Sequence, residues 1–444
     1  MIQVDSRRAG AGKTTEIYTQ IDRLLRKGQR VLLVVPSIEL QECYRKQFPN
    51  AIYVINSRES SELVSLELRR ALYAEEQFIC ITSNAWLNNP IDPDRRSEYH
   101  LIMDEIINPY EERFVQLSDK KNVQLISLLN SAFEIDPTTA GDQWARLLPS
   151  NDRTYTDTNI LDRTLFRDLY NPNYELWVDN ASWSRCLSGQ LPCIYIFRSL
   201  RTQAISGWLS VYIAAAAFQR TFMYAWLRAN GIMPSIVKPF RRHLQIPWIW
   251  TPDDIKFHWT KGKQEDDGYL KSYYQQVHNI LDGESALLLR NNTDRIIPGF
   301  VYEPVSHNAH GINNLAGNTN ICIASATNPT PQMARFLRRE VERAQITDDY
   351  GKHMDYEAVT SWIFEAFAVY NHYQIIMRTA LRNPNNTTPV RVFVYDYRVF
   401  AGLLAYFDIT QWNKIDVYQP KNRIPMTNAE RQRKFRLKKK SEPT

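Results

Sequence analysis

The 444-residue sequence predicts an α/β protein with mostly parallel sheets, from three observations. A strand-like start, MIQVD, leads through a glycine-containing loop into a segment with helical periodicity. A second apolar run, at residues 99–103, ends in two adjacent acids. Further apolar runs and helical segments alternate between these two, and such alternation is typical of βαβ units. The length allows two or three domains.

The first element is a strand, a loop and a helix over residues 1–28. Apolar residues recur with helical spacing from Ile17 to Leu25, and Gly28 marks the end of the helix. The stretch GAGKTT therefore joins a strand to a helix, which is the context that a phosphate-binding loop requires.

In such a loop the glycines let backbone N–H groups approach phosphate oxygens, and the helix N-terminus adds a partial positive charge. The residues expected to bind a nucleotide are Gly10, Ala11, Gly12, Lys13, Thr14 and Thr15. Lys13 is expected to bind the β- and γ-phosphates, and the Thr14 hydroxyl is expected to coordinate a Mg²⁺ ion. The full pattern has Gly or Ala five residues before Gly12, where this chain has Arg7.

The acid pair follows a later apolar strand. Residues 99–103 are mostly apolar, as in a buried parallel strand, and Asp104 and Glu105 stand at its C-terminal end. Ligands bind at that end of the strands in open α/β sheets. We expect Asp104 to hold Mg²⁺ and Glu105 to polarise the attacking water.

Two more strands are predicted between the loop and the acid pair. QRVLLVVPSIELQECYRKQF predicts a strand, a turn at Pro36 and Ser37, and a helix. QFICITSNAWLN predicts a strand with Thr82 and Ser83 at its tip. With the first two strands they form a βαβ series.

In this order, GAGKTT, VVPSIEL, ITSNAW and MDEI resemble motifs I, Ia, Ib and II of superfamily 2 (DEAD/DEAH-like) helicases and translocases. The resemblance implies two RecA-like P-loop domains, with ATP in the cleft between them. It also implies nucleic-acid contacts near Pro36 and Ser37, near Thr82 and Ser83, and near Gly311.

The resemblance extends to motif VI of the second domain, often written QxxGRxxR. HYQIIMRTALRN offers Gln374, Arg378 and Arg382, with Met377 in place of the usual glycine and the second arginine one place late. Arg378 stands at the position of the family's arginine finger. Such an arginine places a fixed positive charge next to the γ-phosphate, where it stabilises the negative charge of the transition state.

The remaining motifs are placed by spacing. The SAT triplet at 325–327 has the letters of motif III, but fewer than fifty residues separate it from Gln374, too few for a second domain. The segment 208–221 fits motif III better, as a strand that ends in small residues. Residues 283–294 resemble the first strand of the second domain, and the loop around Gly311 resembles motif V.

This register divides the chain into two motor domains and their appendages. The predicted parts are a first domain at 1–235 with an insertion at about 108–205, a linker at 236–282, a second domain at 283–410, and a basic tail at 411–444. Trp177 and Trp183 of the insertion are expected to form a small core, the alternative being a platform for bases.

Composition excludes some classes of protein. No apolar run reaches 18 residues and no signal-peptide pattern is present, so we expect a cytoplasmic protein, or a host-cytoplasmic one if it is viral. Five scattered cysteines without a CxxC pair argue against a zinc site. The net charge of +6 comes from residues 421–440, where nine Lys and Arg face one Glu, a composition that favours contact with phosphates.

Taken together, these features predict an ATP- and Mg²⁺-dependent helicase or translocase. DNA is expected rather than RNA, and replication of a phage or mobile element is the expected setting. One alternative is a viral DNA-packaging ATPase of the terminase type, which usually adds a nuclease domain with clustered carboxylates. Another is a nucleic-acid-binding protein that uses ATP as a switch.

Overall fold

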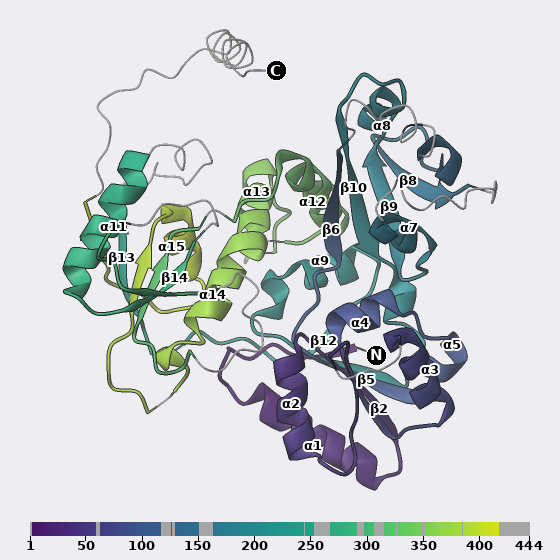
Figure 1. The fold of residues 1–444 in the computed structure, drawn as a ribbon, viewed down its shortest axis with the longest axis horizontal. Coiled ribbons are helices and arrows are strands. Elements are labelled where there is room, and N and C mark those ends of the chain that lie inside the picture. The colour runs from purple at the N-terminus through teal and green to yellow at the C-terminus, as the bar shows by residue number, and fades with distance from the viewer. Residues whose placement is uncertain are drawn as a thin grey trace.

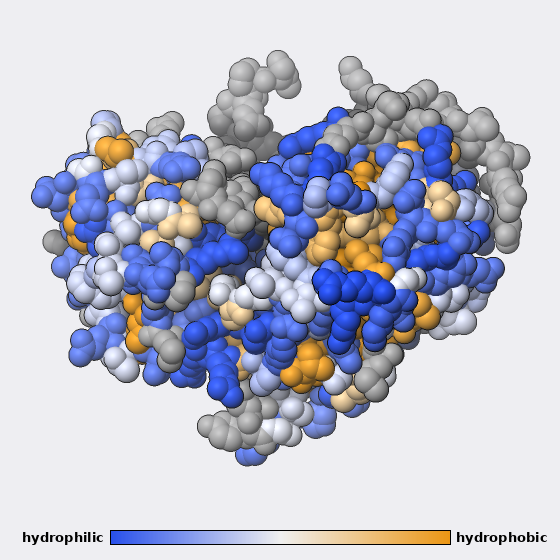
Figure 2. Space-filling model, turned by 90° about the horizontal axis from the view of Figure 1, so that it is seen from below, coloured by the Kyte–Doolittle hydropathy of each residue, from blue (hydrophilic) through white to orange (hydrophobic). Residues whose placement is uncertain are grey.

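The computed structural model describes residues 2–58, 63–116, 126, 129–150, 163–243, 245–252, 267–290, 297–305, 315–325, 327–347, 351–383 and 385–416. Three sheets organise this part of the chain, two parallel and one antiparallel (Figure 1). One face of the molecule is covered largely by hydrophilic side chains, with apolar patches between them (Figure 2). Within the described residues, no helix combines the length and the apolar character needed to cross a membrane.

The first sheet has seven parallel strands and confirms the predicted βαβ series. In spatial order the strands are β12 (Ser235–Lys238), β1 (Ile2–Asp5), β11 (Ser210–Ala214), β5 (Tyr99–Asp104), β2 (Arg30–Val35), β4 (Phe78–Thr82) and β3 (Tyr53–Ile55). The phosphate loop follows β1 and the acid pair ends β5. Only β11 separates these two strands, so both motifs lie at one edge of the sheet.

Helices cover both faces of this sheet because successive side chains of a strand point to opposite faces, and those of the central strands are apolar on both. In β2, Leu33 packs with α1 (Lys13–Arg26) and α2 (Ile38–Gln47), while Leu32 lies in the core on the other face. That other face is covered by α3 (Val64–Tyr73), α4 (Ser83–Asn88), α5 (Pro93–Arg96) and α9 (Phe222–Ala229). Strands buried on both faces read as continuous apolar runs, which explains RVLLVV in β2.

The second sheet has six parallel strands. In spatial order they are β15 (Tyr302–Pro304), β14 (Ala286–Leu289), β16 (Asn320–Ile323), β17 (Arg391–Val394), β13 (Trp248–Pro252) and β18 (Asn413–Ile415). Its helices are α11 (Asp267–Leu281), α14 (Tyr370–Ile376), η4 (Ala380–Arg382) and α15 (Tyr397–Leu403). Helix α14 continues α13 (Tyr356–Phe364) through a π-helical turn, η3 (Glu365–Val369).

Two predicted boundaries need correction. Residues 236–282 are not only a linker, because β13 lies inside the second sheet and the buried residues of α11 share a core with β14. The ring of Trp250 stacks on Phe393 of β17 at a centroid distance of 5.1 Å, which commits this segment to the second domain. The predicted tail begins too early, since β18 extends the same sheet to Ile415. The basic run at 421–440 lies outside the described residues.

The insertion after the acid pair forms an antiparallel sheet of its own. Its strands are β6 (Tyr110–Gln116), β10 (Cys193–Leu200), β9 (Tyr174–Asp179), β8 (Trp144–Pro149) and β7 (Phe133–Ile135), with helices α7 (Arg163–Tyr170) and α8 (Asn180–Leu187). Trp177 and Trp183 are buried, with 8% and 3% of their surface exposed, so they serve a core and not a platform.

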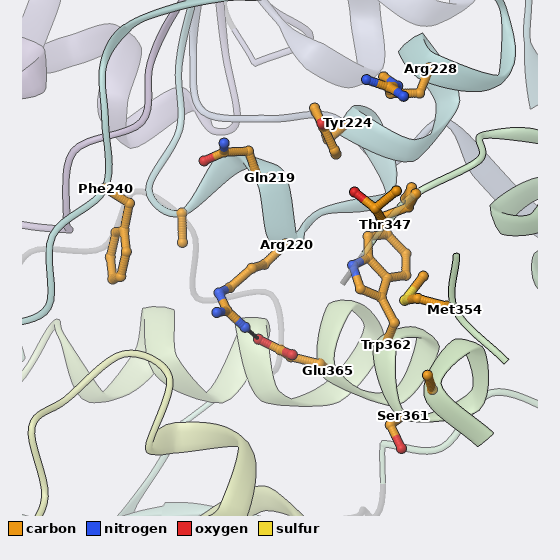
Figure 3. A pocket seen from close by; sticks show the side chains of 13 residues that line it. Gln219, Arg220, Tyr224, Arg228, Phe240, Thr347, Met354, Ser361, Trp362 and Glu365 are labelled. Carbon is orange, nitrogen blue, oxygen red and sulfur yellow. Dashed lines mark hydrogen bonds and ion pairs between the residues drawn. The ribbon is translucent and has the colours of Figure 1, made fainter. Parts of the chain in front are cut away.

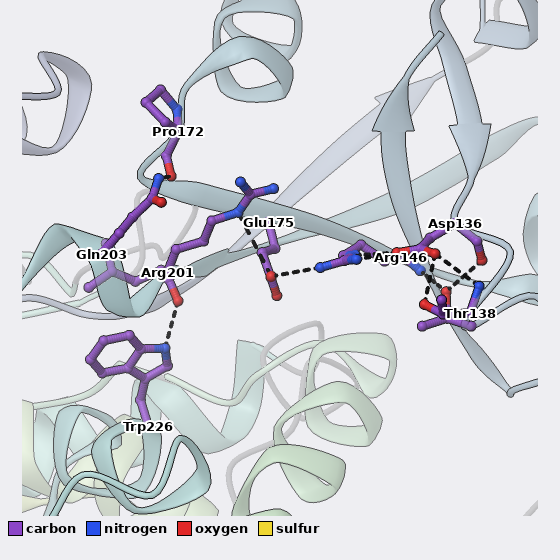
Figure 4. Close-up of polar contacts among 10 residues, drawn as sticks. Asp136, Thr138, Arg146, Pro172, Glu175, Arg201, Gln203 and Trp226 are labelled. Carbon is purple, nitrogen blue, oxygen red and sulfur yellow. Dashed lines mark hydrogen bonds and ion pairs between the residues drawn. The ribbon is translucent and has the colours of Figure 1, made fainter. Parts of the chain in front are cut away.

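Polar contacts fix the sheet of the insertion and attach it to the first domain (Figure 4). Arg146 bonds Asp136 with its Nε at 2.7 Å and Glu175 with its Nη1 at 3.1 Å. The Nε1 of Trp226, on α9 beneath the insertion, donates to the carbonyl of Leu200 at 2.7 Å.

A helix from the second domain's part of the chain also reaches the insertion. After β16 the chain leaves the second sheet and forms α12 (Pro331–Arg343). Phe336 stacks on Phe197 of β10 at 4.8 Å with an interplanar angle of 11°, and Thr330 donates to Glu112 at 2.5 Å. Helix α12 therefore packs against β10 of the insertion, α9 of the first domain and α13, and it lies beside the insertion in Figure 1.

Candidate active site

The phosphate loop has the backbone of an anion-binding nest. Gly10 and Gly12 both have φ of 76°, which L residues with a side chain rarely adopt, and a Cβ on Gly12 would meet nothing within 4 Å. Helix α1 begins at Lys13, so its free N–H groups face the loop. The Nζ of Lys13 donates to the carbonyls of Arg7 and Arg8, each at 3.1 Å, and so folds back on the loop.

Arg7 departs from the pattern without filling the loop. Its guanidinium pairs with the carboxylate of Asp5 at the end of β1, at 2.6 and 2.9 Å. Burial raises the pKa of Asp5, but the hydrogen bonds and charge of Arg7 outweigh it, so the pKa of Asp5 is lowered. The pairing with Asp5 neutralises the charge of Arg7, and Arg7 is not among the residues that line the pocket.

Asp104 is tied to the loop by hydrogen bonds. Its Oδ2 accepts from the Thr14 hydroxyl at 3.0 Å and from the Tyr44 hydroxyl at 2.7 Å. Burial raises the pKa of Asp104 to about 6, against the lowering effect of the bond from Tyr44. Tyr44 lies on α2 and is fully buried, and no feature of the sequence marked it as part of the site. A carboxylate and a hydroxyl oxygen in contact are suitable ligands for Mg²⁺.

Glu105 adopts a strained backbone conformation. Its φ is 103°, outside the regions that L residues favour, and its N–H donates to the carbonyl of Ala214 at 3.0 Å. This bond to the end of β11 turns the side chain of Glu105 out of the sheet toward the pocket. Strain of this kind persists where the surrounding structure imposes it, commonly at functional sites.

The second domain supplies the cations opposite these acids. Arg378 follows α14 and is buried, with 7% of its side chain exposed, and its Nη2 lies 3.7 Å from Oε1 of Glu105. Burial lowers the pKa of Arg378, and the negative charge of Glu105 opposes that effect. Burial likewise lowers the pKa of Lys13, against the charges of Glu105 and Asp104.

One pocket of about 210 Å³ collects most of the predicted residues. It is lined by Ala9, Gly10, Gly12, Lys13, Thr14, Thr15, Asp104, Glu105, Ala216, Gln374, Met377, Arg378 and Arg382. Arg382 covers the loop, since its carbonyl oxygen lies 3.5 Å from where a Cβ on Gly10 would be. Of the residues predicted to bind nucleotide or to act in catalysis, Ala11 alone is absent from this lining. Ala216 follows β11, so the segment 208–221, matched to motif III by its position, contributes to the lining of the pocket.

The predicted nucleic-acid residues lie apart from this pocket, at the ends of β2 and β4. The Ser37 hydroxyl caps α2 by accepting from the N–H of Leu40 at 3.3 Å, and Thr82 caps α4 in the same way. Ser83 donates to the carbonyl of Val35 at 3.0 Å, which joins the two strand ends. Gly311 lies outside the described residues.

The chain resembles known proteins in its fold and not in its sequence. No family model and no curated protein matches the sequence. Two solved structures resemble the chain over nearly its whole length. An apo XPD structure matches with a TM-score of 0.54 at 14% identity, covering 93% of this chain and 96% of that one. The Xpd4 protein of S. tokodaii matches with a TM-score of 0.51 at 12% identity, covering 94% and 96%.

The chain has two RecA-like domains. This confirms the predicted fold class, and the pocket described above lies between the two domains. The first RecA-like domain contributes the loop and the acids, and the second contributes Gln374, Arg378 and Arg382.

The raised pKa of Asp104 makes stability depend on pH. In metal-free buffer the folded protein keeps Asp104 protonated up to about pH 6, whereas the unfolded chain loses that proton near the ordinary value of 3.8. The stabilisation is therefore complete below about pH 4 and is lost as the pH rises through 6. Asp104→Asn, whose amide oxygen can accept the same two bonds, should be more stable than wild type at pH 7, by up to about 3 kcal/mol.

Thermal or urea unfolding of both proteins between pH 4 and pH 7 measures this effect. The stability difference should grow with pH across that range. The exposed substitution Asp22→Asn serves as the control. If the difference in unfolding free energy between Asp104→Asn and wild type stays constant or shrinks as the pH rises, the pKa of Asp104 is not raised in the folded protein.

Proposed function

We propose that this protein is an ATP-dependent nucleic-acid helicase or translocase. The observation that carries the proposal is the shared pocket, in which Lys13 and the acid pair of one RecA-like domain line the same cavity as Arg378 of the other, whose Nη2 lies 3.7 Å from Oε1 of Glu105. A catalytic site completed by two domains links the chemistry to their relative motion. Such a linkage is what a motor that moves along a strand requires.

The residues present fit a magnesium–triphosphate. The nest at Gly10–Thr15 would hold the β- and γ-phosphates through backbone N–H groups, with Lys13 released from the loop carbonyls to bond them. Thr14 and Asp104 would hold Mg²⁺, which supplies charge neutralisation between the phosphates when bound. The existing bond between these two side chains places both oxygens on one side of the nest.

Glu105 and Arg378 would divide the remaining work. Glu105 is aimed into the pocket by its bond to β11, so it can accept a proton from, or orient, an attacking water. Arg378 pairs with Glu105 in this structure and can turn toward the γ-phosphate as negative charge shifts there. Gln374, one helical turn before Arg378, lines the same wall.

The nucleic-acid strand is proposed to cross both domains, with contacts near Pro36 and Ser37 and near Thr82 and Ser83 on the first domain and near Gly311, outside the described residues, on the second. DNA in preference to RNA, and replication in a phage or mobile element, stay predictions from sequence. A packaging ATPase of the terminase type is a weaker alternative, because a RecA-like domain stands where that class adds its nuclease. In the described part of the chain, no three His, Cys, Asp or Glu residues are placed to share a metal ion.

Lys13→Ala tests the site and the function together. The wild-type protein should hydrolyse ATP faster when single-stranded DNA, duplex DNA or RNA is added separately, and the best stimulant identifies the strand. Lys13→Ala should lose hydrolysis because it removes the cation nearest the phosphates, while Lys27→Ala at the exposed end of α1 should keep the wild-type rate. An ATPase that no nucleic acid stimulates would favour the ATP-switched binding protein instead.

Arg378 tests the contribution of the second domain. Arg378→Ala should lower kcat by about 10³-fold, the lower range for removal of an arginine finger, with little change in nucleotide affinity. Arg378→Lys should recover little, since a lysine lacks the rigid fork of a guanidinium. The exposed Arg335→Ala is the matched control. A wild-type kcat in Arg378→Ala would show that this arginine of the second domain takes no part in ATP hydrolysis.

A further inference from the structure

A tyrosine outside the predicted motif letters bonds the phosphate loop directly. The Tyr373 hydroxyl accepts from the backbone N–H of Ala9 at 2.9 Å, and it lies 2.8 Å from Nε2 of His243. Tyr373 is on α14 of the second domain and is completely buried, and His243 is 6% exposed. The loop of one domain is therefore held by the helix of the other.

The direction of these bonds follows from the state of the histidine. Burial, with the positive charges of Arg8 and Lys13, lowers the pKa of His243 to about 3, so its ring is neutral at ordinary pH. Burial raises the pKa of Tyr373, so its hydroxyl stays protonated. A neutral imidazole has one accepting nitrogen, and in the tautomer with Nε2 unprotonated the hydroxyl donates to His243 while it accepts from Ala9. A chain of bonds of this kind is mutually strengthening.

The ring of Tyr373 packs in an aromatic cluster with residues that follow α15. It stacks on Tyr406 at a centroid distance of 4.3 Å and an interplanar angle of 24°, and Phe407 lies edge-on at 5.8 Å. The N–H of His243 donates to the carbonyl of Tyr406 at 3.1 Å, so the histidine belongs to the same cluster. The hydroxyl is then the part of this cluster that reaches the phosphate loop by a hydrogen bond.

The same helix is tied to the first domain at a second point. Arg220, in the turn after β11, forms an ion pair with Glu365 at the start of the π-helical turn η3, as Figure 3 shows. The π turn thus lies between two ties, one at Glu365 and one at Tyr373. π-helical turns inside α-helices are frequent at functional sites. The tie at Tyr373 is the one next to Gln374 and Arg378.

We propose that Tyr373 is a positioning residue that sets the distance between the phosphate loop and Arg378. This inference rests on the proposed ATPase function. The hydrogen bond from Ala9 to the Tyr373 hydroxyl fixes the phosphate loop relative to α14. Because Arg378 follows this helix five residues after Tyr373, the same bond fixes the position of Arg378 relative to the loop. The loss of the hydroxyl should leave nucleotide binding nearly intact and misplace the arginine in the reaction.

Tyr373→Phe and Tyr406→Phe form a matched pair for the test. The first removes a hydroxyl with two partners, while the Tyr406 hydroxyl is buried without a hydrogen-bond partner in the described structure. We expect Tyr373→Phe to lower kcat for ATP about tenfold, with the affinity for a fluorescent ATP analogue changed less than about threefold. Tyr406→Phe should retain the wild-type kcat. Thermal unfolding of each variant confirms that the comparison is made on folded protein.

The double variant Tyr373→Phe/Arg378→Ala separates positioning from general damage. If Tyr373 acts through Arg378, the double variant should hydrolyse ATP no more slowly than Arg378→Ala. A further tenfold loss, an unchanged kcat in Tyr373→Phe, or an equal loss in Tyr406→Phe would each overturn the inference and leave the proposed function standing. A folded wild-type protein that hydrolyses no nucleotide would overturn both.

Discussion

The arrangement depends on one electrostatic constraint: opposite charges from two domains are held together away from water. Glu105 and Asp104 stand on one RecA-like domain with Lys13, and Arg378 enters from the other. Burial penalises the charged forms of Asp104, Lys13 and Arg378, as the raised pKa of Asp104 and the lowered pKa values of Lys13 and Arg378 show. Each charge is acceptable there only because a partner of opposite sign is close. A triphosphate with its metal would change that balance.

The rest of the fold places these charges at that meeting point. The carboxyl ends of β1, β5 and β11 deliver the loop, the acids and Ala216 to one edge of the first sheet. Helix α14 delivers Arg378 from the second. The contacts of Tyr373 and Glu365 join the α13–α14 helix to the first domain, and α12 packs against α13, α9 and the antiparallel insertion.

The sequence was most informative where a local pattern carries the chemistry. The phosphate loop and the Asp104–Glu105 pair each occupy a few consecutive residues whose neighbours form the required strand and helix. Arg378 could be predicted only from the order of motifs, since its own surroundings read as an ordinary basic helix. The sequence did not predict that β13 belongs to the second sheet, because its partner β17 lies about 140 residues later. The strand is also short and lies between irregular segments, so its residues show no clear alternation of apolar and polar side chains.

Tyr44, Tyr373 and His243 escaped for a similar reason. Their sequence neighbours give a tyrosine or a histidine on an apolar face no special meaning, and their roles come from contacts with residues 60, 364 and 130 positions away. The departures at Arg7 and Arg382 also needed the structure to be understood. Arg7 is neutralised by Asp5, and the late position of Arg382 still places its backbone over Gly10.

The most direct measurement is an experimental structure with Mg²⁺ and a non-hydrolysable ATP analogue. The account predicts the triphosphate in the nest at Gly10–Thr15, the metal on Thr14 and Asp104, and the guanidinium of Arg378 moved from Glu105 to the γ-phosphate. A nucleotide bound elsewhere, or an Arg378 that stays on Glu105 while the triphosphate fills the nest, would contradict it.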